Sequence, residues 1–287
     1  MAPPDLASMR WGNHTLAWGR ETYVMAIVNV TPDSFSGDGV GANIGEAVAK
    51  AAAAVRAGAA IIDLGGESTR PGHTPIEIDQ EIARVVPAIR AIAKRIQTPI
   101  SIDTSKAAVA EAAIVAGASI VNDVRGLVRD PEMATVIARH GLPAIVMHDG
   151  VPEPGIDLMA NILRELSRRV EHALAAGIAP NLIVIDPGFG FGKDWRQNLE
   201  ILRRLRELEV LGLPILVGLS RKTTIGRVLG LAENDRLEGT LATTALAIAN
   251  GADIVRVHDV LPNVRVARLT DAVMRGAPAE PRSWLDG

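Results

Sequence analysis

Eight short apolar runs recur along this chain, and a polar residue ends or closely follows most of them. The run at 182–186 is a clear case, because four apolar residues precede Asp186 and a glycine-rich stretch follows at 187–193. A short β-branched run between turn residues is typical of a buried strand, which places Asp186 at the carboxyl end of that strand. Stretches with helical spacing separate the runs, so the sequence predicts strands and helices in alternation.

This alternation restricts the fold class. We expect strands near 24–29, 60–64, 98–103, 119–124, 142–148, 182–186, 213–218 and 253–258. Eight strand–helix units predict a parallel sheet, and they fit one closed (β/α)8 TIM barrel over 1–287 better than an open doubly wound sheet, which is the alternative. A β-hairpin around Gly12-Asn13 precedes the first strand, and we expect it at the bottom of the barrel.

Local signals predict where several helices begin and which residues they bury. Asn43 is expected to cap the first helix, and Ser105 the helix that begins at Lys106. The helix expected over 196–208 carries leucines at core spacing, namely Leu199, Leu202 and Leu205.

Composition excludes several classes of function. The chain has no cysteine, which rules out a disulfide framework and a thiolate nucleophile. It has no apolar signal region at its start and no apolar run long enough to span a bilayer, so we expect a cytoplasmic protein without a membrane partner. A net charge of −3 and an aromatic content of 3% argue against a nucleic-acid partner.

Polar residues gather at the expected strand ends. In a parallel barrel all carboxyl ends lie on one face, where the functional residues of such folds sit. Leaving these groups buried and unpaired costs roughly a few kcal/mol each, so a shared ligand pocket explains the set better than folding does. The set comprises Asn29, Asp103, Asn122, Asp186, Lys222, Arg256 and His258.

The residue types in this set suit two kinds of ligand. Asp103, Asn122 and Asp186 offer the oxygens that a flat heterocycle with several N–H donors requires. Arg256 and His258 alternate on one strand and therefore point the same way, which suits a polyanion. A structural ion pair is the alternative for Arg256.

A second anion site is predicted where the stretch 220–226 opens a helix. Backbone N–H groups and the helix dipole favour a carboxylate or phosphate there, although an ordinary capped helix start explains the same residues. Three further polar residues are interpreted as structural: Asp123, His148 and Asp259.

The motifs of this chain, taken in order, closely resemble those of dihydropteroate synthases. They span about 24–260 and comprise Asn29-Val-Thr-Pro-Asp-Ser-Phe-Ser36, Gly65-Gly-Glu-Ser-Thr-Arg-Pro-Gly72, Ser101-Ile-Asp-Thr104, Asn122-Asp-Val124, Asp186-Pro-Gly-Phe-Gly-Phe-Gly-Lys193, Ser220-Arg-Lys222 and Arg256-Val-His258. That family joins 6-hydroxymethyl-7,8-dihydropterin diphosphate to 4-aminobenzoate for folate biosynthesis. The resemblance implies a Mg²⁺ cofactor, a homodimer and a sulfonamide target.

The resemblance also implies roles for individual residues. Catalysis would depend on Asp103, Asp186, Lys222 and Arg256. The pterin would contact Asp103, Asn122, Met147, Asp186, Phe191, Gly218 and Lys222. The diphosphate would contact Asn29, Arg70, Arg256 and His258, and Mg²⁺ would bind Asn29 and Asp33. The 4-aminobenzoate would contact Phe35, Thr69, Pro71, Ser220 and Lys222. We expect the loops 31–41 and 65–74 to be mobile and to complete this last site.

Two alternatives to this function are considered. A corrinoid methyltransferase domain that binds methyltetrahydrofolate would share the barrel and the pterin pocket, but it needs neither the Arg256-x-His258 pair nor the Asn29 loop. A non-catalytic pterin-binding paralogue would lack a residue at a strand end, and none is missing here. The chain departs from the usual family pattern at Arg125, at Thr224 and in the loop after His148.

Overall fold

The fold is a parallel barrel of eight strands surrounded by helices. The structure is a computed structural model, and it describes residues 6–30, 40–67 and 74–276. The barrel strands are β3 (Tyr23–Asn29), β4 (Ile61–Gly65), β5 (Ile100–Asp103), β6 (Ile120–Asp123), β7 (Ala144–Met147), β8 (Ile183–Asp186), β9 (Leu216–Val217) and β10 (Ile254–Val257). The helices are α1 (Val40–Arg56), α2 (Ile78–Ala93), α3 (Ala107–Ala116), α4 (Met133–His140), α5 (Leu158–Ala175), α6 (Trp195–Arg204), α7 (Thr223–Leu229), α8 (Leu237–Ala249) and α9 (Val260–Arg275).

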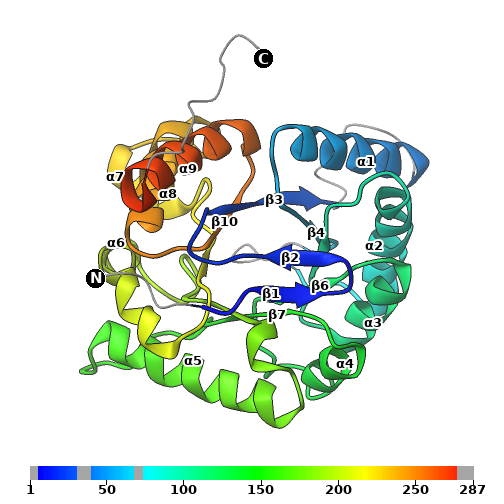
Figure 1. Ribbon diagram of the computed structural model, residues 1–287, viewed down its shortest axis with the longest axis horizontal. Helices are drawn as coiled ribbons and strands as arrows, with labels where there is room; N and C mark the ends of the chain where they lie inside the picture. Colours follow the sequence, from blue (N-terminus) through cyan, green and yellow to red (C-terminus); the bar gives the residue numbers. More distant parts are fainter. Residues whose placement is uncertain (1–5, 31–39, 68–73, 277–287) are drawn as a thin grey trace.

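The strands form a ring, which excludes the open doubly wound sheet. Their order is β8-β7-β6-β5-β4-β3-β10-β9, and every pair is parallel. The ring is closed by a parallel bridge between Ile185 of β8 and Ile215, the residue before β9. Because helices cover the outside, the strands are buried on both faces, which explains their continuous apolar runs (Figure 1).

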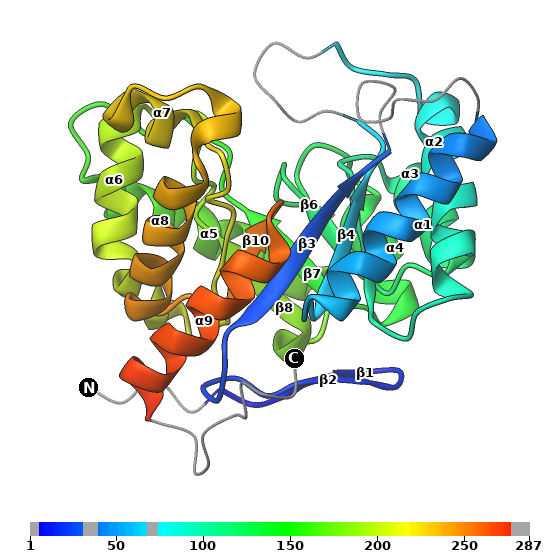
Figure 2. The same cartoon turned by 90° about the horizontal axis from the view of Figure 1, so that it is seen from above.

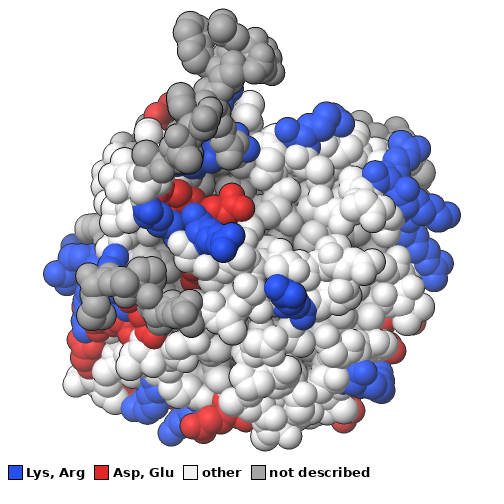
Figure 3. Space-filling model, in the orientation of Figure 1, with Lys and Arg blue, Asp and Glu red and all other residues white. Residues whose placement is uncertain are grey.

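The predicted hairpin is confirmed and lies at the bottom of the barrel. β1 (Met9–Trp11) and β2 (His14–Leu16) pair antiparallel across the two-residue turn Gly12-Asn13. Figure 2 shows the hairpin crossing the end of the barrel opposite to the carboxyl end of β3. Met9, Trp11 and Leu16 are buried against the core. Charges of both signs are scattered over the described part of this face (Figure 3).

Three local expectations were wrong, and a tertiary contact explains one of them. α1 begins at Val40, so position 43 lies inside the helix and not before its first residue. Ser105 does not cap α3, because the Asp130 carboxylate from the loop before α4 accepts the Ala107 N–H at 2.8 Å. Leu199 is 37% exposed, because the buried face of α6 runs through Asn198, Ile201 and Leu202 instead.

None of the helices in the described ranges combines the length and apolar content needed to cross a bilayer.

Candidate active site

The predicted strand-end residues gather at one end of the barrel. Asp103 and Asn122 are direct neighbours in the β5–β6 register, and Met147 is opposite Asp186 in the β7–β8 register. Asp103, Asn122 and Asp186 are nearly completely buried. Five proposed site residues lie outside the described ranges and are not placed: Asp33, Phe35, Thr69, Arg70 and Pro71.

Arg256 is the centre of a buried polar network that connects four strands, β10, β4, β5 and β6. Its guanidinium donates from Nη2 to Asp103 Oδ2 at 2.6 Å and from Nε to Asp63 Oδ2 at 2.6 Å. Asn122 Nδ2 lies 3.3 Å from the same Asp63 oxygen. In this structure Arg256 therefore contacts Asp103, one of the acids assigned to the pterin, in addition to any contact that it makes with a polyanion.

Asp63 is a site residue that the sequence interpretation missed. It is completely buried in β4, where it compensates the Arg256 charge and orients the Asn122 amide. The signal was present, because Asp63 is an acid within the apolar run of 61–64, and a carboxylate is rarely buried there without a partner.

Asp103 presents an oxygen that no described residue satisfies. Its Oδ1 is buried and has no hydrogen-bond partner, whereas Oδ2 is paired with Arg256. Burial raises the pKa of Asp103 to about 7, although Arg256 acts to lower it. A buried acceptor without a donor costs free energy, so this atom is a candidate for contact with the N–H groups of a ligand.

The β8–α6 turn forms one wall beside these acids. Asp186 Oδ1 accepts the Gly188 N–H at 2.7 Å, and burial raises the pKa of Asp186 to about 6. Lys222 Nζ lies 4.3 Å from the centroid of the Phe191 ring, a cation–π contact. Gly190, with φ of +86°, permits this approach, because a Cβ there would lie 3.0 Å from the Lys222 stem.

The space left beside the acids is small. A cavity of about 30 Å³ lies between Asp103 and Phe191, which is room for one or two waters. A two-ring heterocycle needs more room than this cavity alone provides.

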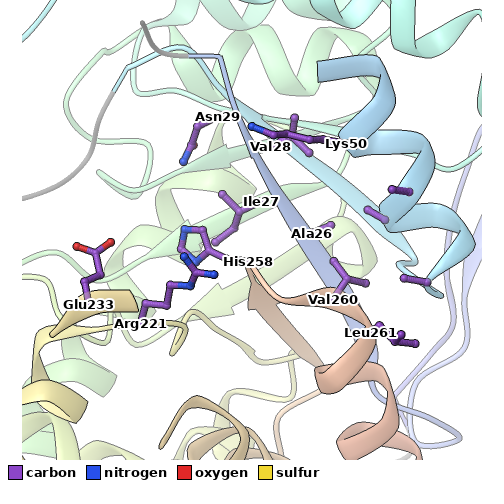
Figure 4. Close-up of a pocket in the computed structure, with 13 residues that line it drawn as sticks. Ala26, Ile27, Val28, Asn29, Lys50, Arg221, Glu233, His258, Val260 and Leu261 are labelled. Atoms are coloured by element: carbon purple, nitrogen blue, oxygen red, sulfur yellow. The ribbon is translucent and has the colours of Figure 1, made fainter. Parts of the chain in front are cut away.

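A larger cavity lies next to the proposed diphosphate residues. It has a volume of about 490 Å³, and Asn29, His258 and Arg221 surround its inner part, with Lys50 of α1 beside it (Figure 4). Ser220 Oγ lies 3.0 Å from His258 Nδ1 and accepts the His258 backbone N–H. The residues proposed for the diphosphate and for the aminobenzoate carboxylate are therefore in direct contact.

The remaining pterin residues lie at strand ends with different surroundings. Met147 is buried at the end of β7, and its carbonyl accepts a hydrogen bond from Arg169 of α5. Gly218 directly follows β9, and a Cβ placed on it would meet nothing within 4 Å, so its lack of a side chain leaves open space.

Asp123 and Asp259 have structural contacts. The Asp123 carboxylate accepts the backbone N–H groups of Arg125 and Leu127, which holds a turn in which Leu127 has φ of +65°. Asp259 forms a two-point ion pair with Arg221.

The two side chains that depart from the family pattern also have partners. Thr224 is buried and accepts a hydrogen bond from Asn198 at 3.1 Å. Arg125 pairs with Asp149 at 3.0 Å, in the loop after His148.

His148 is expected to make folding sensitive to acid. Burial lowers its pKa to about 3, and the positive charges of Lys193 and Arg169 contribute. In the unfolded chain the pKa of a histidine is about 6.5. Neutral His148 therefore contributes fully to the free energy of unfolding above this pH, and the contribution is lost as the pH falls toward 3. The expected loss is up to about 1.4 kcal/mol per pH unit in this window.

Urea unfolding of the wild type and of His148→Asn at about pH 7 and about pH 5 measures this effect. The advantage of the wild type over the variant should shrink by about 2 kcal/mol on acidification. The comparison with the variant is needed because Asp103, Asp123 and Asp186 have raised pKa values. These acids make the fold more stable as the pH falls, which opposes the effect of His148. A difference that does not change with pH would contradict the neutral state of His148.

Known proteins match this fold and these motifs. The model of the family described as pterin binding enzyme matches residues 25–258. A dihydropteroate synthase of Clostridium beijerinckii is 46% identical over 268 residues, which cover 93% of this chain and 100% of that protein. The Bacillus subtilis dihydropteroate synthase is 45% identical and covers 90% of this chain and 91% of its own length.

Solved structures agree. A dihydropteroate synthase from Clostridium difficile in the presence of pteroic acid superposes with a TM-score of 0.88 at 50% identity, covering 91% of this chain and 99% of that one. A Yersinia pestis dihydropteroate synthase with a sulfonamide drug superposes with a TM-score of 0.87 at 40% identity, and the match covers 93% of this chain and 99% of that one. These matches do not favour either alternative function. The chain belongs to the dihydropteroate synthase family of pterin-binding enzymes.

Proposed function

We propose that this chain joins 6-hydroxymethyl-7,8-dihydropterin diphosphate to 4-aminobenzoate with the buried network around Arg256 at the centre of its active site. The observation that supports this most directly is the Asp103 carboxylate, which is held by Arg256 through one oxygen and has its other oxygen buried without a partner. Incubation with both substrates and Mg²⁺, followed by detection of 7,8-dihydropteroate, tests the proposal. Absence of product from folded protein would overturn it.

The pterin is proposed to lie among Asp103, Asn122, Asp186 and Lys222, with Met147, Phe191 and Gly218 around it. Its N–H groups would donate to the two carboxylates and to the Asn122 oxygen, and Lys222 would donate to a ring acceptor. Burial lowers the pKa of Lys222 to about 8, so its ammonium form predominates at neutral pH. One of these contacts would give Asp103 Oδ1 the hydrogen bond that it otherwise lacks.

The reaction needs charge stabilisation at two places. Arg256 and His258 are proposed to neutralise the leaving diphosphate, so that the C–O bond breaks early. The ionised Asp103 carboxylate then stabilises the positive charge left on the pterin, and the aromatic amine attacks that cation. No covalent nucleophile from the protein is required.

Mg²⁺ is proposed to bind with the diphosphate at Asn29 and Asp33. The position of Asn29 supports this, because it ends β3 and lines the cavity of about 490 Å³ together with His258. The described residues contain no group of three His, Asp or Glu side chains that could hold a metal, so diphosphate oxygens would complete the coordination. When bound, Mg²⁺ would neutralise charge on the leaving group.

The second substrate is expected to bind well only after Mg²⁺–diphosphate. Ser220, proposed to receive the aminobenzoate carboxylate, is held by His258, which is proposed to contact the diphosphate. Anion binding at His258 would change the contacts of Ser220, and Phe35, Thr69, Arg70 and Pro71 are proposed to contribute from outside the described ranges. Calorimetric titration of a sulfonamide with and without Mg²⁺–diphosphate should show affinities that differ by about tenfold or more. Equal affinities would contradict this order.

A homodimer and a cytoplasmic location, both expected from the sequence, are part of the proposal. Exposed apolar side chains on two helices that pack together support the dimer: Leu246 of α8 is 53% exposed, and Leu269 and Val273 of α9 are 69% and 74% exposed. Such a patch suits contact with a second copy of the chain.

A further inference from the structure

Lys193 joins the two loops that border the pterin side of the site. It follows the glycine-rich turn after β8, and its ammonium donates to three backbone carbonyls. The acceptors are His148 O at 3.1 Å, Gly188 O at 3.1 Å and Phe191 O at 2.8 Å. An ammonium group has three N–H donors, so all of them are used.

The backbone around Lys193 is arranged for this contact. Gly188 and Gly192 have φ of +70° and +66°, and a Cβ on Gly188 would lie 1.7 Å from His148 O. A Cβ on Gly192 would lie 2.7 Å from Gly150 O. Only glycine permits the β8–α6 turn to lie this close to the loop after β7. Three backbone carbonyls converge on Lys193 Nζ, and burial lowers the pKa of its ammonium group to about 7.

The contact with Phe191 connects Lys193 to the proposed chemistry. Phe191 O receives the shortest of the three hydrogen bonds, and the ring of the same residue lies under the Lys222 ammonium. The position of the Phe191 backbone sets the direction of its ring. Phe191 therefore contacts Lys193 through its backbone and Lys222 through its ring.

We propose that Lys193 is a positioning residue for the pterin substrate, which fixes the Phe191 ring and through it the Lys222 ammonium. This inference rests on the proposed function, in which Phe191 and Lys222 contact the pterin. Loss of the three hydrogen bonds should affect the pterin more than the 4-aminobenzoate. Lys222 is assigned to both substrates, but the aminobenzoate carboxylate is proposed to bind at Ser220, which contacts His258.

Steady-state kinetics of Lys193→Met test the proposal. The variant keeps a similar length and removes all three donors. We expect KM for the pterin diphosphate to rise about tenfold, the scale of one or two lost hydrogen bonds. KM for 4-aminobenzoate, which shares only Lys222 with this set of contacts, should rise less than about threefold. Lys94→Met, at an exposed position after α2, is the matched control and should leave both values unchanged.

A double-mutant cycle with Phe191→Ala separates positioning from general stabilisation. If Lys193 acts through the ring, Lys193→Met should raise the pterin KM by less than about twofold when Phe191 is already alanine. The same tenfold effect in both backgrounds, or equal changes of both KM values, would overturn the proposal. If Lys193→Met fails to fold, Lys193→Gln is the second variant. It keeps two N–H donors and should give a smaller rise in the pterin KM, and no rise would overturn the positioning role of Lys193.

The outcomes also distinguish this inference from the proposed function. If Phe191→Ala alone leaves the pterin KM unchanged, the assignment of Phe191 to the pterin site fails. If Phe191→Ala raises the pterin KM while the Lys193 variants do not, only the positioning role fails.

Discussion

Replacement of Asp103 by Asn is expected to lower kcat by about 10²-fold or more. The substitution keeps the shape of the side chain but removes the negative charge that faces the pterin, and a lost electrostatic contact in a preorganised site has effects of this size. The remaining amide can still accept a hydrogen bond from Arg256, so the fold of the strand ends should persist. The measurement is single-turnover formation of 7,8-dihydropteroate by the purified variant.

Asp253→Asn is the matched control for this experiment. Asp253 is also a buried acid whose pKa burial raises to about 6. It directly precedes β10 and accepts the Ile215 N–H at 2.9 Å, so it lies away from the carboxyl ends of the strands, where the site is. Turnover of this variant should stay within about twofold of the wild type. Near-normal turnover of Asp103→Asn would remove the role proposed for the carboxylate.

The pH profile gives an independent test of the same group. Because burial raises the pKa of Asp103 to about 7, the carboxylate takes up a proton as the pH falls through that value. The kcat/KM of the wild type, which reports on the free enzyme, should therefore fall below about pH 7, and this acid limb should weaken in Asp103→Asn. Because the pKa of Asp186 is about 6, kcat/KM of Asp103→Asn should still fall at a lower pH, as Asp186 takes up a proton.

The fold could be predicted from sequence because its determinants are local. Each barrel strand is a short apolar run followed by turn residues, and each helix repeats apolar residues at its own spacing, so alternation and chain length were enough to indicate the barrel. The exceptions depend on tertiary contacts. The cap of α3 comes from Asp130, which lies 23 residues further along the chain, and no local pattern indicates it.

The site was predictable only to the extent that strand ends converge. Asp103, Asn122 and Asp186 were found because each ends an apolar run. Asp63 was missed because its importance depends on Arg256, which is 193 residues away and contacts it only after the ring closes. The same contact explains why the sequence offered an ion pair at Arg256 only as an alternative and without partners, since the acids that pair with it are not visible in the local sequence.

Replacement of Arg256 by Ala is expected to have two large effects. It leaves the buried carboxylates of Asp63 and Asp103 without their ion-pair partner, which should destabilise the fold by about 3–5 kcal/mol. It also removes a charged donor from the proposed diphosphate site. We expect KM for the pterin diphosphate to rise about 10- to 100-fold, since a hydrogen bond to a charged group contributes about 1.5–3 kcal/mol.

The two effects can be separated by comparing ligands and variants. Asp63→Asn keeps Arg256 but weakens the network that holds it, so this control should lower stability while it raises the KM for the diphosphate substrate by much less. A pterin without the diphosphate reports on the acids alone. If Arg256 binds the leaving group, Arg256→Ala should weaken the binding of the diphosphate substrate by a factor at least about tenfold larger than it weakens the binding of this pterin. An equal loss of affinity for both ligands would show that Arg256 only pairs with Asp63 and Asp103. Arg256 would then form the structural ion pair that the sequence analysis gives as the alternative.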